Sequence, residues 1–180
     1  EYILSQGGSC VLLSHLGRPE GRDPKLSLKH IVNEVSRALE APVQFCDQTV
    51  GPEAESRALA LEAGHVLLME NLRYAKEETH GDEAFAEQLA RLGTVYVNDA
   101  FGTVHRAHSS TTIIAKFFPK KKCFGLLLAK EVNAINKVMK DGESPIVAIL
   151  GGAKVSSKIT IIESLLEKVD HLIIGGGMVY

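Results

Sequence analysis

Short apolar runs alternate with amphipathic helical patterns along almost the whole chain, and this alternation constrains the fold most strongly. Strands are expected at 11–14, 43–46, 66–69, 95–97, 146–150 and 172–174, and helices at 27–40, 52–63, 82–92, 111–117, 131–139 and 155–167. The apolar stretch 123–128 fits either type. Because the strand runs are continuous, burial on both faces is expected. The pattern predicts an α/β fold, a Rossmann-like three-layer parallel sheet with flanking helices.

Charge and cysteine usage exclude several classes of protein. The formal net charge is −2, so no global basic field favours nucleic acid. No apolar run approaches the roughly 18 residues that a membrane span needs. The three cysteines are widely spaced and form no CxxC motif, which favours free thiols in a reducing compartment. We therefore expect neither a nucleic acid nor a membrane as partner.

Polar and cationic segments follow the predicted strands, where open parallel sheets bind their ligands. The first three such segments supply Arg18, Arg73 and Arg106, with His15, His105 and His108. Guanidinium groups bind carboxylate and phosphate in bidentate fashion. Each arginine alone is more typical of a surface ion pair, but three at successive strand ends favour a site for a small phosphorylated acid. The His105-x-x-His108 pair is a weak metal motif, because no Cys or carboxylate at ligand spacing accompanies it.

A second kind of segment follows the strand at 146–150. Gly151 and Gly152 allow backbone N–H groups to approach a phosphate, and Lys154 and Lys158 lie four residues apart on the next helix. The segment matches neither a P-loop nor GxGxxG. Spacing alone leaves a nucleotide site and a tight turn with two solvated lysines equally open. The glycines at 175–177 follow the next strand and are a weaker signal of the same kind.

Six segments, in the same order as in the family, resemble phosphoglycerate kinase. They are SHLGRP at 14–19, ENLR at 70–73, VNDAFGT at 97–103, HRAHSS at 105–110, LGGAKV at 150–155 and IIGGGM at 173–178. The resemblance implies a two-domain kinase truncated at both ends. Residues 1–128 would form the phosphoglycerate-binding domain without its first strand, 129–143 the interdomain helix or hinge, and 144–180 the start of the nucleotide-binding domain.

The resemblance also implies roles for individual residues. Positions that match the substrate side are Ser14, His15, Gly17, Arg18, Leu72, Arg73, His105, Arg106 and His108. Positions that match the nucleotide side are Gly152, Ala153, Lys154, Ser157, Lys158 and Gly176. Arg106, Lys154 and Lys158 would be catalytic. Magnesium would arrive as MgATP or MgADP, its protein ligand is expected outside this chain, and no metal ligand is assigned within it.

The implied reaction is reversible phosphoryl transfer between 1,3-bisphosphoglycerate with ADP and 3-phosphoglycerate with ATP. Ser157 stands where many relatives carry Asp. The family's first strand and most of its second domain have no counterpart, so the chain alone is expected to be inactive, poorly stable and rich in exposed apolar surface. A cytoplasmic monomer is the family expectation, with an organellar form left open.

Two alternatives remain from the sequence. A Rossmann-type oxidoreductase would need GxGxxG and an acidic residue about 20 positions later, and neither is present. The predicted anion site that holds Arg18, Arg73 and Arg106 is called the substrate rim. A non-catalytic relative that acts as a binding protein would be expected to lose these cations, and they are retained here.

Overall fold

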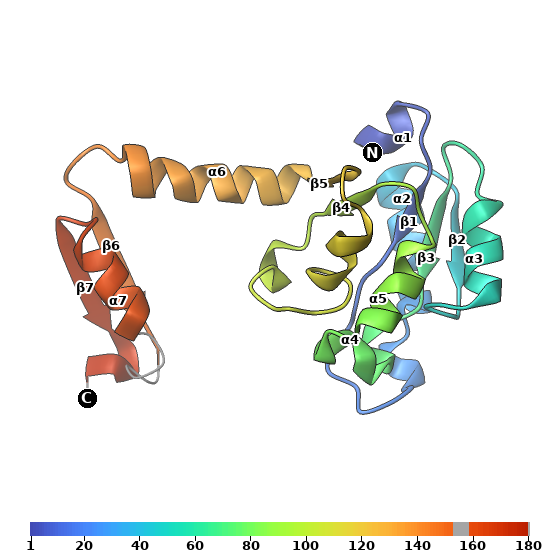
Figure 1. Ribbon diagram of the computed structural model, residues 1–180, viewed down its shortest axis with the longest axis horizontal. Coiled ribbons are helices and arrows are strands. Elements are labelled where there is room, and N and C mark those ends of the chain that lie inside the picture. The colour runs from blue at the N-terminus through green and yellow to red at the C-terminus, as the bar shows by residue number, and fades with distance from the viewer. Residues whose placement is uncertain (153–158, 180) are drawn as a thin grey trace. The chain divides into compact units, whose positions relative to one another are not determined.

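The computed structural model describes residues 1–152 and 159–179, which fall into two compact units, 1–125 and 126–180 (Figure 1). Every strand pair in the described part of the chain is parallel, and the strands form three small sheets. The predicted α/β class with parallel strands is therefore confirmed. No described helix is long and apolar enough to cross a membrane.

The largest sheet of the N-terminal unit contains β1 (Cys10–Leu12), β2 (Val43–Cys46) and β3 (Val66–Met69), in the order β1-β3-β2 (Figure 1). The chain passes from β1 to β2 through α2 (Val32–Leu39) and from β2 to β3 through α3 (Pro52–Leu59). Because all three strands are parallel, their carboxyl ends meet at one edge of the sheet. The segment after β1 and α4 (Lys76–His80) both lie at this end, the lower one in Figure 1.

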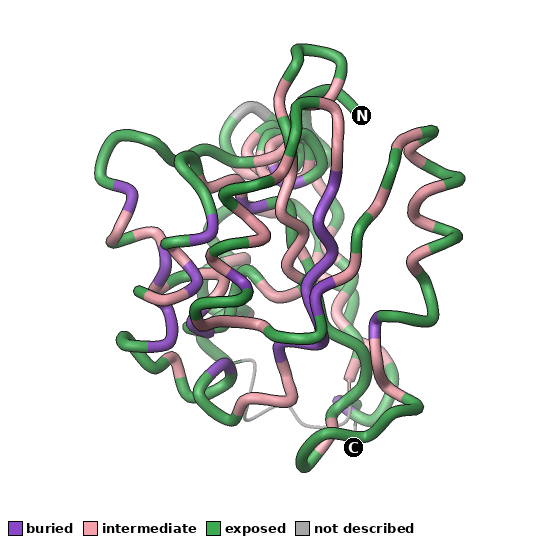
Figure 2. The backbone as a smooth tube through the Cα atoms, turned by 90° about the vertical axis from the view of Figure 1, so that its right-hand side faces the viewer, coloured by how far each residue is buried: buried purple, intermediate pink, exposed green. Residues whose placement is uncertain are grey.

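The core of this unit is centred on β3. Residues 66–72 are all buried and form a continuous purple stretch of the tube in Figure 2. Phe85 and Leu89 of α5 (Glu83–Ala90) pack into the same cluster as Leu67. Ile114, in the 3-10 helix Ile113–Phe117, joins them. Burial on both faces, as the continuous apolar run predicts, is confirmed for β3.

Truncating the centre of this core should unfold the unit at lower denaturant. Leu67 is 0% exposed, so Leu67→Ala should cost about 2–5 kcal/mol through lost burial and a residual cavity. Leu59, at the end of α3, is 83% exposed, and Leu59→Ala should change the free energy of unfolding by no more than about 0.5 kcal/mol. Urea unfolding of the two variants checks this, and equal losses would contradict the assigned core.

Polar side chains cap the starts of two of the described helices. The Ser27 hydroxyl accepts a bond from the Lys29 N–H and so caps the 3-10 turn Leu28–Ile31, which precedes α2. Asp82 caps α5 by accepting from the Phe85 N–H at 2.8 Å. The helix expected at 111–117 is a 3-10 helix, and α4 was not predicted. The N-terminal residues form a short helix, α1 (Tyr2–Ser5).

The ambiguous stretch 123–128 divides between two elements. β5 (Lys122–Phe124) pairs with β4 (Tyr96–Asn98) in a separate two-stranded sheet. Leu126 then begins α6 (Leu126–Asp141), which is longer than the helix expected at 131–139. This helix belongs to the second compact unit. The assignment of 129–143 as an interdomain hinge stays a prediction.

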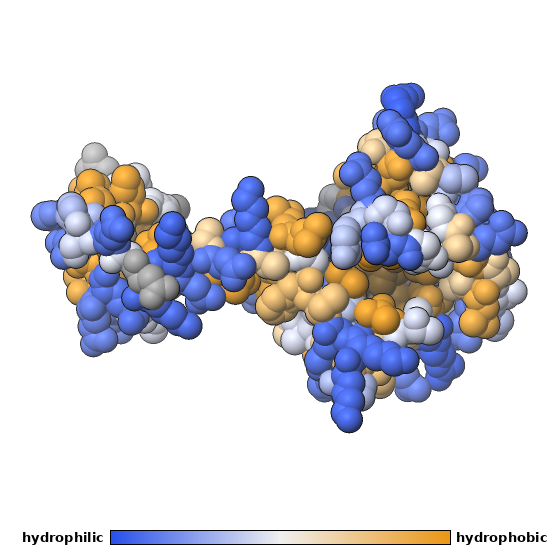
Figure 3. All heavy atoms as spheres, turned by 90° about the horizontal axis from the view of Figure 1, so that it is seen from above, coloured by the Kyte–Doolittle hydropathy of each residue, from blue (hydrophilic) through white to orange (hydrophobic). Residues whose placement is uncertain are grey.

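The C-terminal unit holds α6, β6 (Val147–Gly151), α7 (Ile159–Leu166), β7 (His171–Gly175) and a 3-10 turn, Gly176–Val179. For β6 and β7 the expected burial on both faces is wrong. Ile149 is 74% exposed and Ile173 is 52% exposed. Figure 3 shows such hydrophobic side chains, in orange, on the surface of this unit. Two strands and one described crossover helix are too few to cover both faces of a parallel sheet. Poor stability of the isolated chain stays a prediction.

Candidate anion-binding site

A buried amide joins the segments that follow β1 and β3. Asn71 is fully buried, and its side-chain NH₂ donates to the carbonyls of Leu16 at 2.8 Å and Leu26 at 2.9 Å. Its side-chain oxygen accepts from the Arg73 N–H at 3.1 Å. One side chain therefore fixes the loop after β1 against the residue that carries a candidate anion-binding guanidinium.

The two strand ends also bond directly. The Leu72 N–H donates to the Ser14 carbonyl at 3.1 Å, while the Leu72 side chain is buried in the core. The Arg73 guanidinium donates from Nη1 to the Gly17 carbonyl at 2.8 Å. Gly17 has φ +66°, and an added Cβ would lie 3.1 Å from Leu26, so both conformation and space favour glycine. This turn places Arg18 beside the Arg73 side chain.

Glu70, which precedes Asn71 in the ENLR segment, stabilises the fold and does not belong to the rim. It is 3% exposed, and its carboxylate accepts from the Ser27 hydroxyl at 2.7 Å and the Leu28 N–H at 2.9 Å. A third bond comes from the Asn71 N–H at 2.7 Å. Because a buried carboxylate needs such partners, Glu70 is fully used in fixing the start of the Leu28–Ile31 turn.

The third candidate segment folds back onto the end of β4. The Tyr96 hydroxyl donates to the carbonyls of Ser110 at 2.8 Å and Thr111 at 3.0 Å. The Asn98 side-chain NH₂ donates to the Thr111 carbonyl at 3.2 Å. Burial raises the pKa of Tyr96, so its hydroxyl remains a donor throughout the neutral range. These bonds fix residues 110–111, which follow Arg106 closely in the chain.

The three arginines interact across one rim. Burial, and then the charges of Arg18 and Arg106, lower the pKa of Arg73. The charges of the guanidinium groups that follow β1 and β4 therefore act on the guanidinium that follows β3, and their joint role in binding an anion stays a prediction. Their mutual repulsion makes the rim attractive to an anion, because a bound carboxylate or phosphate would offset it.

Two histidines of the rim, His15 and His108, are biased toward the neutral form. Burial first, and then Arg73 and His108, lower the pKa of His15. For His108, which is 7% exposed, burial also lowers the pKa and outweighs the opposing carboxylate of Glu78. His105 is exposed, and its Nε2 accepts from the Arg106 Nε at 3.3 Å.

These pKa shifts predict how stability depends on pH. Below the ordinary value of 6.5, unfolded His15 and His108 bind protons more readily than the folded residues do. The free energy of unfolding should therefore fall as pH falls through that value toward the lowered folded pKa. Urea unfolding at about pH 7.5 and 5.5 measures this loss. The loss in the free energy of unfolding between these two pH values should be smaller in His108→Gln. The control is His80→Gln, which should keep the full loss because His80 is exposed on α4. Equal losses in both would contradict the assignment.

Comparison with known proteins gives the family to which this arrangement belongs. A sequence model described as phosphoglycerate kinase matches residues 1–180. The chain belongs to the phosphoglycerate kinase family. It is 50% identical over 178 residues to the phosphoglycerate kinase of Herpetosiphon aurantiacus, covering 98% of this chain and 45% of the relative. It is 47% identical over 180 residues to the cytosolic phosphoglycerate kinase of Nicotiana tabacum, covering all of this chain and 45% of the relative.

Solved phosphoglycerate kinases share the fold. The Coxiella burnetii structure matches with a TM-score of 0.80 at 37% identity, over 97% of this chain and 43% of that chain. The Pyrococcus horikoshii structure matches with a TM-score of 0.81 at 29% identity, over 97% of this chain and 45% of that chain. The chain thus spans slightly less than half the length of the phosphoglycerate kinases it matches.

On the nucleotide side, the structure describes only part of the predicted set. Gly176 follows β7 with φ +67°, and a Cβ added there would lie 3.4 Å from the backbone of Gly152, which follows β6. The two glycines therefore lie together at one edge of the β6–β7 sheet. Ala153, Lys154, Ser157 and Lys158 lie outside the described residues. Within the described ranges, no group of three His, Cys, Asp or Glu side chains could hold a metal ion.

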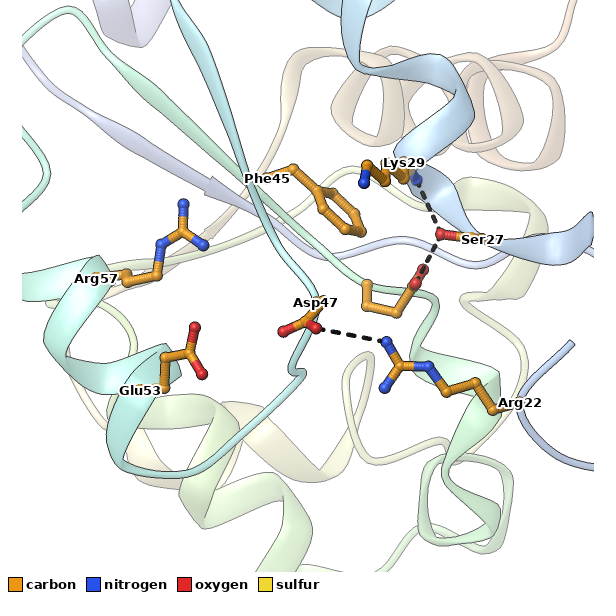
Figure 4. Close-up of a pocket in the computed structure, with 8 residues that line it drawn as sticks. Arg22, Ser27, Lys29, Phe45, Asp47, Glu53 and Arg57 are labelled. Carbon is orange, nitrogen blue, oxygen red and sulfur yellow. Dashed lines mark hydrogen bonds and ion pairs between the residues drawn. The ribbon is translucent and has the colours of Figure 1, made fainter. Parts of the chain in front are cut away.

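A separate hollow of about 400 Å³ lies near the ends of β2 and β3. Figure 4 shows Phe45 on its wall, Arg22 directed toward Asp47, and Glu53 beside Arg57. Arg22 and Asp47 lie 3.8 Å apart. Three basic and three acidic side chains line it, so the charge is balanced and no anion is favoured. The rim remains the stronger candidate for binding an anion.

Sequence reasoning missed the residues that hold the rim in place. Asn71 stands inside a quoted motif, yet no role was assigned to it. Ser110 also stands inside one of the motifs without an assigned role, and Glu78 was not singled out at all. Glu78 lies in an acidic stretch whose pattern is typical of a solvated helix, so its burial had no local signal.

Proposed function

We propose that a chain of full family length carrying these residues is a phosphoglycerate kinase. It would transfer a phosphoryl group reversibly between 1,3-bisphosphoglycerate with ADP and 3-phosphoglycerate with ATP. In the direction of ATP formation, a β-phosphate oxygen of ADP attacks the acyl phosphate. The bond from phosphorus to the carboxyl oxygen breaks, and the carboxylate leaves as 3-phosphoglycerate.

The bond from the Arg73 guanidinium to the Gly17 carbonyl, next to Arg18, and the effect of the Arg18 and Arg106 charges on Arg73 support this proposal. A phosphoglycerate offers a carboxylate and a phosphate, and guanidinium groups can bind both ends in fixed orientation. Phosphoryl transfer depends on positioning and on neutralising oxygens, with little covalent work by the protein. A rim that presents three cations without covalent machinery suits that requirement.

The remaining contributions come from the family resemblance. Lys154 and Lys158 would offset charge on the nucleotide and on the transferring group, and Gly152 and Gly176 would let backbone N–H groups approach phosphates. Magnesium would enter as MgATP or MgADP, where it supplies charge neutralisation. Its protein ligand would come from a part of the family fold that this chain does not span. A cytoplasmic monomer is proposed on the same ground.

The proposal is tested by an assay of ATP-dependent phosphorylation of 3-phosphoglycerate, coupled to NADH oxidation. A chain of full family length should turn over. Binding of both ligands without turnover would favour a non-catalytic binding protein and direct attention to Ser157. Binding of neither ligand would overturn the function altogether.

The 180 residues alone should show no measurable turnover in the same assay. They span 45% of the relatives' length, and transfer needs both substrates held in line. The full-length chain is the control on the same preparation. Turnover by the 180-residue chain at a rate comparable to the control would show that these residues alone suffice for the reaction.

A further inference from the structure

A buried carboxylate lies behind the cationic rim. Glu78, on α4, is 3% exposed, and a charge at that depth is costly unless it is paired and hydrogen-bonded. Its Oε2 accepts from the Ser110 N–H at 3.0 Å, and its Oε1 accepts from the Ser110 hydroxyl at 2.6 Å. The His108 Nδ1 lies 3.8 Å from the same Oε1. All of these partners belong to the segment that carries Arg106.

The backbone around Glu78 holds the same segment. The Ser109 N–H donates to the Glu78 carbonyl at 2.9 Å. The Ser109 hydroxyl, fully buried, has contacts of 2.9 Å with the carbonyls of both Glu77 and Asp82. The end of α4 and residues 108–110 therefore form one hydrogen-bonded unit with little freedom to shift separately.

This anchoring continues to Arg106. Its carbonyl accepts from the hydroxyls of Thr111 and Thr112, each at 3.1 Å. Those residues follow Ser110 directly in the chain. A displacement at Ser110 would therefore move the backbone that presents the Arg106 guanidinium, although Glu78 itself does not face the rim's ligand.

Glu78 also acts through its charge. It raises the pKa of both Arg73 and His108, against the burial that lowers them. The charged and titratable groups that act on His108 are Glu78 from α4, Arg73 from the end of β3, and Arg106 and His105 from its own segment, while His108 acts on His15. A carboxylate in this place offsets part of the repulsion among the cations.

We propose that Glu78 is a positioning residue of the anion site, which anchors residues 105–112 through Ser110 and offsets part of the charge of the neighbouring cations. The inference rests on the proposed function for the identity of the ligand. Its own content is that the placement of Arg106 depends on a carboxylate that does not touch substrate.

The experiment compares three variants of a chain of full family length. Glu78→Ala removes anchor and charge together. Glu78→Gln keeps both Ser110 bonds, because the amide can accept from the N–H and donate to the hydroxyl, but it removes the charge. Glu77→Gln is the matched control, since Glu77 is exposed on the same helix. We measure KM for 3-phosphoglycerate, KM for MgATP, kcat and the melting temperature.

We expect Glu78→Ala to raise KM for 3-phosphoglycerate at least about tenfold while KM for MgATP stays unchanged. Glu78→Gln should remain within about threefold of the wild type, because the anchor survives. NMR titration of the His108 ring should show a lower pKa in Glu78→Gln and an unchanged one in Glu77→Gln. A merely structural role would lower the melting temperature without this selective change in KM, and that outcome would overturn the proposal.

If Glu78→Ala does not fold, Ser110→Ala tests the same anchor from the other side. It should raise KM for 3-phosphoglycerate several-fold, and an unchanged KM would overturn the inference. Absence of turnover in the wild type would instead refute the proposed function. In that case, inorganic phosphate titrated against the Arg106 and His108 amide signals still tests Glu78, because Glu78→Ala should weaken that response and Glu77→Gln should not. Equal responses in those two variants would overturn the inference.

Discussion

Replacing Arg106 by Ala in a chain of full family length should lower kcat/KM for 3-phosphoglycerate about 10²–10³-fold. Removing one well-placed charged donor from a transition-state site typically has that effect. Arg106 comes from the segment after β4, and its charge acts on Arg73 at the end of β3. Arg73 should not take its place, because the Arg73 guanidinium is held by its bond to the Gly17 carbonyl.

Arg91→Ala is the matched control for this result. Arg91 lies just after α5 in the same unit, with its guanidinium 3.1 Å from Glu87 and 3.8 Å from Glu55. Exposed pairs of this kind contribute roughly 0–1 kcal/mol, so the variant should fold and turn over as the wild type does. Similar losses in both variants would mean that the assay responds to overall charge or stability. An unchanged kcat/KM in Arg106→Ala would show that the rim has no part in the reaction.

The rim could be predicted from the sequence because it follows from local pattern and one topological rule. Continuous apolar runs marked β2 and β3 at their observed bounds, and parallel strands place their following residues at one edge. Arg18 and Arg73 needed nothing further to be placed together. The exposed faces of β6 and β7 could not be predicted in this way, since apolar content indicates which residues favour burial, not which segments cover them.

The supports of the rim could not be predicted because they depend on contacts distant in sequence. Asn71 bonds to Leu16, 55 positions away, and Glu78 bonds to Ser110, 32 positions away. Neither amides nor carboxylates have a periodic signature that distinguishes a buried residue from a solvated one. Such residues are recognised only when the fold shows that their polar groups are satisfied in the interior.

Gly81→Ala should strongly destabilise the chain near the site. Gly81 ends α4 with φ +69°, which costs a residue with a Cβ about 1–2 kcal/mol. The added Cβ would also lie 2.4 Å from the Ala107 carbonyl oxygen, so backbone must move. Overpacking of this kind adds about 1–3 kcal/mol, for a total loss of about 2–5 kcal/mol in the free energy of unfolding.

The movement should also reach the site, because Ala107 adjoins Arg106 and the clash pushes on the segment that Glu78 anchors from the same helix. We expect KM for 3-phosphoglycerate to rise at least about tenfold, with KM for MgATP unchanged. Gly64→Ala is the matched control, since Gly64 has φ +79° but no atom within 4 Å of an added Cβ. It should lose only the conformational cost of about 1–2 kcal/mol and keep its KM. The free energy of unfolding is measured with urea, and KM is measured by kinetics. Equal changes in both quantities for the two variants would show that only the strain at φ matters. The contact with Ala107 would then not position the rim.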